Sequence, residues 1–139
     1  MFAVRAASAV LFGVMGVVAL TMAWRGLTAQ SLLPFHQAAT GRPWTELAPG
    51  EQSVATALTR SLGLGFLAAG LALLVASVTD VAHQDVATYS LAAIALVFCA
   101  GLALINRRLQ LATSVGTPWK RSLYAAVAIA VALALYRIA

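Results

Sequence analysis

The sequence predicts an all-α integral membrane protein whose four transmembrane helices form an antiparallel bundle. Hydrophobic residues make up 62% of the 139-residue chain and charged residues only 9%, far outside the composition of soluble globular domains. The charged residues also gather between four apolar stretches, as expected when a charge at bilayer depth costs roughly 3 kcal/mol. We therefore expect residues 1–139 to form one transmembrane domain.

Each apolar stretch approaches the roughly 20 residues that cross a hydrocarbon core of about 30 Å. The first is free of charge up to the interfacial pair Trp24 and Arg25, and the second follows the helix-breaking Pro49 and Gly50. The third stops before Arg107, and the fourth begins at an interfacial tryptophan. The predicted spans are residues 6–25, 53–78, 87–106 and 119–137.

Small residues recur at helical spacing within the spans, as at Ala9 and Gly13 in the first and Gly65 and Ala69 in the second. In lipid, the burial of apolar side chains brings little gain, so small residues matter because they let helices approach closely. This pattern favours a compact bundle.

The distribution of Lys and Arg predicts the orientation, because positively charged loops tend to remain in the cytoplasm. Seven of these nine residues lie in or beside the first and third loops, which share one side of the membrane. The loop between the second and third spans has none. We expect a multi-pass protein of the bacterial inner membrane with both termini on the non-cytoplasmic side.

The formal net charge of +5 is compatible with binding to nucleic acid or to a membrane surface. The basic residues are dispersed and form no basic stripe or aromatic-basic module, which argues against nucleic acid. Anchoring to anionic lipid head groups explains them better. The expected partners are membrane lipids, with other membrane-protein subunits or further copies of the chain as alternatives.

The first loop, residues 27–50, is the longest segment outside the spans. Pro34 and Gly41 are placed to begin and end a short helix, and nearby apolar residues such as Trp44 favour an interfacial or re-entrant position for it. His36 on this helix is a candidate proton carrier or ligand. A single histidine lacks the three or four ligands usual for zinc, so a structural hydrogen-bonding role is preferred.

The second loop contains Asp80, His83 and Asp85. If a helix continued through it, Asp80 and His83 would share a face and could bind a divalent ion weakly. A solvated turn is the simpler interpretation. Because His36 lies on the other side of the membrane, it cannot share a ligand set with His83, and we predict neither a metal site nor a cofactor.

The third loop ends in a Thr-Pro-Trp sequence followed by two bases, which predicts a helix start at the interface. Since loops one and three face the same side, they could form a cationic, aromatic-lined mouth for a lipid head group or another anion. Two independently anchored interfaces are the simpler alternative. The candidate contact residues for a ligand or partner are His36, Arg42, Trp44, Arg60, Trp119, Lys120 and Arg121.

The sequence offers little catalytic machinery. No acid or base lies near the middle of a span, whereas proton-coupled transporters and ion pathways usually need one there. It contains no GxSxG, phosphate-binding loop or HExxH motif, and no histidines placed to ligate haem inside a bundle. We predict no catalytic residues.

Two loop motifs carry a resemblance to known proteins. They are Pro34-Phe35-His36 with Gly41 and Trp44, and Thr117-Pro118-Trp119. With them the chain resembles uncharacterised small four-span bacterial inner-membrane proteins, and it is broadly similar in size and helix count to DoxX-like membrane proteins. The resemblance implies a fold and a location, and no catalytic residue.

These observations lead to two main hypotheses of function, with an enzyme that acts on a lipid as a third and less favoured one. The first is a non-enzymatic membrane protein, either an accessory or structural subunit of a larger assembly or a small self-contained bundle. The second is a binder or carrier of a lipid, quinone or other amphipathic small molecule at the mouth formed by loops one and three.

Overall fold

The computed structural model describes residues 2–81 and 85–138, of which 88% are helical and none is in a strand. Four helices are long and apolar enough to cross a membrane, which confirms the predicted all-α membrane fold class. The elements are α1 (Phe2–Leu27), α2 (Pro34–Thr40), the 3-10 helix η1 (Trp44–Glu46), α3 (Pro49–Val81), α4 (Asp85–Thr113) and α5 (Trp119–Ile138).

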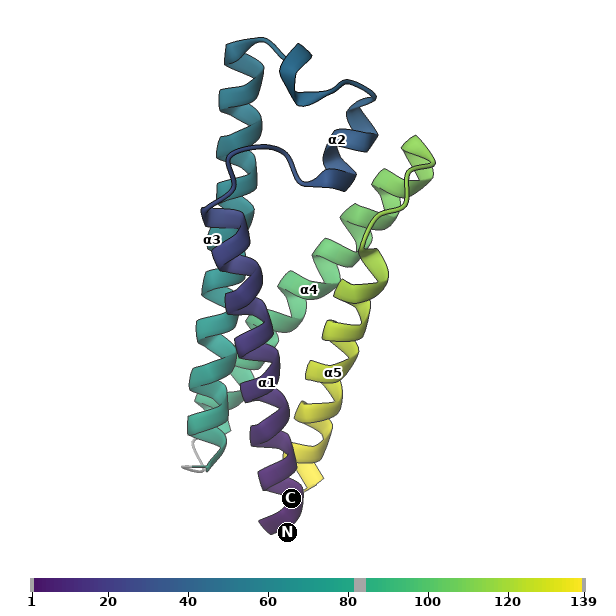
Figure 1. The fold of residues 1–139 in the computed structure, drawn as a ribbon. Helices are drawn as coiled ribbons and strands as arrows, with labels where there is room; N and C mark the ends of the chain where they lie inside the picture. The colour runs from purple at the N-terminus through teal and green to yellow at the C-terminus, as the bar shows by residue number, and fades with distance from the viewer. Residues whose placement is uncertain (1, 82–84, 139) are drawn as a thin grey trace.

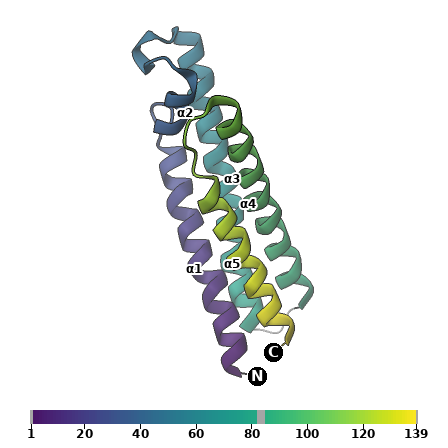
Figure 2. The same ribbon diagram turned by 90° about the vertical axis from the view of Figure 1, so that its right-hand side faces the viewer.

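The long helices alternate in direction along the molecule (Figure 1). Both ends of the chain lie at one end of the bundle, here called the terminal end (Figures 1 and 2). The segment between α1 and α3 and the connection between α4 and α5 lie at the opposite end, called the loop end. Contacts agree with this order: Ser77 late in α3 donates a hydrogen bond of 2.8 Å to the carbonyl oxygen of Ala9 early in α1.

The helices α1 and α3 approach most closely where glycines face each other. A Cβ atom added at Gly63 would lie 2.7 Å from the nitrogen of Leu27, and one added at Gly26 would lie 2.7 Å from the Cα of Gly63. The same two helices also approach each other closely at Gly16 and Gly70. A Cβ on Gly16 would lie 3.1 Å from the carbonyl oxygen of Gly70, and a Cβ on Gly70 would lie 3.1 Å from the carbonyl oxygen of Gly16. Backbone therefore packs on backbone, the arrangement that small residues allow in lipid.

The bundle core combines a few large side chains with many small ones. Phe12, Leu73 and Ile129 are almost completely buried. Small, mostly alanine, neighbours surround these larger side chains. The buried cluster consists of Phe12, Ala69, Leu73, Ala76, Ala92, Ala95, Cys99, Ala126, Ile129 and Ala132.

At the loop end the helices extend beyond the predicted spans. α4 continues past Arg107 to Thr113, and α3 begins at Pro49, a residue that suits the first helical position. Charged residues mark where a helix leaves the hydrocarbon, whereas the helix itself ends where another chain conformation begins. For α4 this point is Ser114, with a positive φ of 56°. These additional turns of α3 and α4 contain residues of the candidate functional site described below.

Candidate functional site

The short helix predicted in loop one is present as α2. Pro34 occupies its first turn, and Gly41 closes it in the left-handed conformation with φ 66°. The Gly41 N–H donates to the carbonyl oxygen of Ala38 at 3.3 Å, which satisfies an otherwise free carbonyl. The two residues that predicted the helix boundaries therefore set them.

His36 is half-buried on α2 beside Phe35, with 4.0 Å between the ring centroids. Partial burial disfavours the charged imidazolium and lowers the pKa of His36 below its usual value near 6.5. This environment suits a neutral side chain that packs against its neighbours, and the hydrogen-bonding role preferred for His36 stays a prediction.

The lowered pKa predicts that α2 loosens in acid. The unfolded loop takes up a proton more readily than the folded loop, so the contribution of His36 is complete above its unfolded pKa and is lost as the pH falls through the lower folded value. We compare the hydrogen–deuterium exchange rate of the α2 amides with that of the His36→Gln variant at each pH. As the pH falls from 7 to 5, we expect the ratio of the wild-type rate to the variant rate to rise. Equal pH profiles for both proteins would contradict this expectation.

Arg42 forms an ion pair with Glu51 at the start of α3. Its Nη2 lies 3.0 Å from Oε1 of Glu51, and the Ala48 N–H donates to the other carboxylate oxygen at 2.9 Å. Both charged side chains are about half exposed, so the pair contributes little stability of its own. Glu51 instead ties the end of loop one to the first turn of α3.

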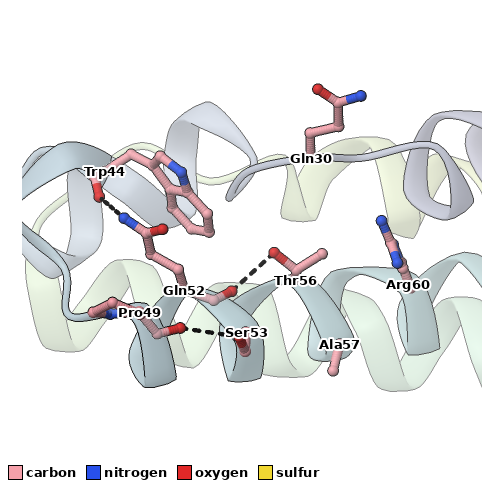
Figure 3. A pocket seen from close by; sticks show the side chains of 8 residues that line it. All are labelled: Gln30, Trp44, Pro49, Gln52, Ser53, Thr56, Ala57 and Arg60. Atoms are coloured by element: carbon pink, nitrogen blue, oxygen red, sulfur yellow. Dashed lines mark hydrogen bonds between the residues drawn. The ribbon is translucent and has the colours of Figure 1, made fainter.

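Trp44 is fastened to the same helix through its backbone. The Gln52 side-chain N–H₂ donates to the carbonyl oxygens of Trp44 at 3.0 Å and of Leu47 at 3.1 Å. Leu47 is buried beneath this turn. These contacts hold η1 against α3 and place the indole of Trp44 over the helix surface (Figure 3).

A pocket of about 520 Å³ opens between loop one and the first three turns of α3. In the close-up, the side chains of Trp44, Thr56 and Arg60 project into the gap between loop and helix (Figure 3). Arg60 is the single charged residue among those that line it. The lining residues are Gln30, Trp44, Pro49, Gln52, Ser53, Thr56, Ala57 and Arg60.

The predicted residues of loop three form a separate cluster. The Trp119 ring lies 5.8 Å from the guanidinium carbon of Arg107 and 5.9 Å from the Lys120 amine. Thr117 donates a hydrogen bond of 2.7 Å to the carbonyl oxygen of Asn106 on α4. Trp119 therefore packs within its own helical hairpin, and Arg121 is exposed beside it.

The mouth predicted between loops one and three is not closed by direct contacts. Within residues 2–81 and 85–138, no hydrogen bond, ion pair or ring contact joins Arg42 or Trp44 to the Trp119 cluster. Trp44 and Arg60 share the pocket on α3 instead. The mouth and the alternative of two separate interfaces both stay predictions.

A cluster at the terminal end was missed by the sequence analysis. The guanidinium of Arg5 lies 5.3 Å from the ring centroid of Tyr136, whose hydroxyl donates to Asp85, and Tyr89 packs edge-on against the same ring. These contacts join α1, α4 and α5. Because four spans alternate in direction, Arg5 and Asp85 lie on the same side of the membrane. The span order could therefore have predicted that these two residues lie close together.

The possible divalent-ion site in loop two consists of Asp80 and His83. His83 and the side chain of Asp80 lie outside the described residues. In the described part of the chain, no group of three His, Cys, Asp or Glu side chains is close enough to hold a metal ion.

No family model, curated protein or solved structure matches this chain. The resemblance of its two loop motifs to small four-span inner-membrane proteins therefore stays a prediction.

Proposed function

We propose that this chain is a non-enzymatic accessory or structural subunit of a larger assembly in the bacterial inner membrane. The observation that carries the proposal is the use of polar groups inside the bundle. Ser8 donates to the carbonyl oxygen of Ala132 at 3.0 Å, and the hydroxyls of Thr79 and Thr88 lie 2.9 Å apart. Such side chains fasten helix to helix, which is a structural use.

The outward surface is equally compatible with this proposal and with a bundle surrounded only by lipid. Between 22% and 39% of the most apolar part of each spanning helix is buried inside the bundle, and every spanning helix also carries exposed apolar side chains. On α4 the outward residues include Ile94, Val97 and Leu104. A surface of this kind packs equally well against lipid chains and against the helices of another subunit.

Photo-crosslinking in native membranes tests the proposal. Four outward valines provide a matched set, one on each spanning helix: Val10 on α1, Val75 on α3, Val97 on α4 and Val127 on α5. We expect a photoreactive residue at one or two neighbouring positions to capture one defined protein, which also copurifies in a fixed ratio in mild detergent. Lipid adducts alone at all four positions would refute an accessory role.

The proposal includes an orientation, with the basic loop end in the cytoplasm. Arg42, Arg60, Arg107 and Arg121 all lie there, and cytoplasmic loops are enriched in such residues. We expect alkaline phosphatase fused to the C-terminus to be active and a fluorescent protein fused there to be dark. Insertion of either reporter after Gly116 should give the opposite pattern. A fluorescent C-terminal fusion would reverse the orientation.

A second candidate function is the binding of an amphipathic small molecule. The observation that favours it is the pocket beside α3, which combines Trp44 and Arg60. In this candidate function the pocket is the place of binding. Intact-mass analysis of the protein purified from native membranes tests it, because one defined molecule retained without a protein partner would favour binding over an accessory role.

A further inference from the structure

We propose that the pocket between loop one and α3 binds a single anionic phospholipid with a hydroxylated head group, whose phosphate lies on Arg60. This inference deepens the second candidate function by naming the class of ligand. It rests on the depth of the pocket in the membrane, on its charge, and on the hydrogen-bonding groups that remain open in it.

The depth of the pocket matches the head-group layer. From Leu62 to Val78, α3 carries no charged residue, and these residues extend for about 25 Å, close to the thickness of the hydrocarbon core. Arg60 therefore lies at the edge of the hydrocarbon. Pro49 begins the helix about 16 Å farther out, so the pocket covers the level at which lipid phosphates and head groups lie.

The charge of the pocket favours an anion. Arg60 is its single charged lining residue. The nearby acid Glu51 is already paired with Arg42, at 3.0 Å. A phosphodiester would complement the guanidinium through charge-assisted hydrogen bonds, whereas the ammonium of a zwitterionic lipid would find no carboxylate among the lining residues.

The hydrogen bonds already made within the pocket leave acceptors open. The Ser53 hydroxyl donates to the backbone carbonyl oxygen of Pro49 at 2.9 Å, and the Thr56 hydroxyl donates to the backbone carbonyl oxygen of Gln52 at 2.8 Å. Gln52 uses its side-chain N–H₂ on the backbone of loop one. The oxygens of these three side chains can therefore accept hydrogen bonds, so a matching head group brings hydroxyl donors.

Trp44 completes the pocket on the loop side. Its indole faces the first turns of α3 (Figure 3), and tryptophan is enriched at this level of membranes because it combines an apolar ring with a polar N–H. The ring covers the carbon atoms of the head group while Arg60 holds its phosphate. Arg60, Thr56 and Trp44 thus recognise phosphate, hydroxyl and hydrocarbon parts of one lipid.

Native mass spectrometry after exchange into defined lipids tests the proposal. The wild-type protein, offered phosphatidylglycerol, phosphatidylethanolamine and phosphatidic acid in equal amounts, is expected to retain one phosphatidylglycerol. The Arg60→Gln variant should retain about tenfold less, since a charged hydrogen bond contributes roughly 1.5 kcal/mol or more. The matched Arg108→Gln variant, which removes an exposed base of α4 outside the pocket, should bind like the wild type.

Two further measurements separate the parts of the proposal. Thr56→Val keeps the side-chain shape, and it should reduce the preference for phosphatidylglycerol over phosphatidic acid without loss of phosphate binding. Inorganic phosphate, added to lipid-free protein in detergent, should bind far more weakly than the lipid does. Equal retention of phosphatidylglycerol by Arg60→Gln and wild type would overturn the site, and tight binding of free phosphate would overturn its assignment to a lipid.

The outcomes also separate this inference from the proposals on which it draws. A different amphipathic molecule displaced from the pocket by Trp44→Leu would refute the phospholipid and keep the second candidate function. If the pocket bound neither a phospholipid nor another amphipathic molecule, both this inference and the second candidate function would be refuted. The crosslinking test of an accessory role would be unaffected.

Discussion

Replacement of Gly63 by alanine is expected to lower the free energy of unfolding in detergent by about 2 kcal/mol, the typical effect of an overpacked interface. The new Cβ would lie 2.7 Å from the nitrogen of Leu27 and 2.9 Å from the carbonyl carbon of Gly26. Both are backbone atoms, which cannot move aside as a flexible side chain can. Relief requires the backbones of α1 and α3 to move apart at this contact. Thermal or denaturant unfolding, followed by far-UV circular dichroism, measures the effect.

Gly101→Ala is the matched control for this substitution. Gly101 lies within α4, and a Cβ there would meet no atom within 4 Å. Alanine is a better helix former than glycine by about 1 kcal/mol, so this variant should be at least as stable as the wild type. If Gly63→Ala and Gly101→Ala behave alike, close packing at Gly63 does not stabilise the bundle.

Replacement of Phe12 by alanine is expected to have the second large effect, again about 2 kcal/mol. Phe12 has no exposed surface and packs among residues of α3, α4 and α5 in the core cluster. In a membrane, little is lost by transferring the ring to lipid, so the effect comes from the cavity and its lost van der Waals contacts. The same unfolding assay measures it.

Val10→Ala provides the comparison on the same helix. Val10 is 63% exposed on the lipid-facing side of α1, so its truncation leaves no internal cavity. We expect a change below about 0.5 kcal/mol, as is usual for surface positions. A loss of stability equal to that of Phe12→Ala would indicate that α1 is packed differently.

Much of the fold could be predicted from composition because a membrane imposes a strong length and polarity rule on each span. The helix in loop one was also predictable, since Pro34 and Gly41 act through local backbone geometry. The contact between Gly26 and Gly63 was not. The predicted first span ends at residue 25, before Gly26. Which glycines face each other depends on how the two helices cross, and the spacing of residues within one span does not determine that crossing.

The candidate site was predictable only in part. Trp44 and Arg60 were both singled out, and the structure brings them to one pocket. The predicted mouth was built by assigning loops to a side of the membrane, which says nothing about lateral distance. Trp119 was thus expected near Trp44, whereas its ring contacts lie with Arg107 and Lys120. Gln52 was missed because its role arises from hydrogen bonds to loop backbone, which no sequence motif marks.

The glycine-lined contact between α1 and α3 also bears on the order in which the protein is made. These two helices precede α4 and α5 in the sequence, and their closest contacts require no residue of either later helix. A tight helical hairpin can therefore be completed in the bilayer while the second half of the chain is still being synthesised. The later spans then meet a finished surface, and an error at Gly63 would be present before Phe12 has its full set of neighbours.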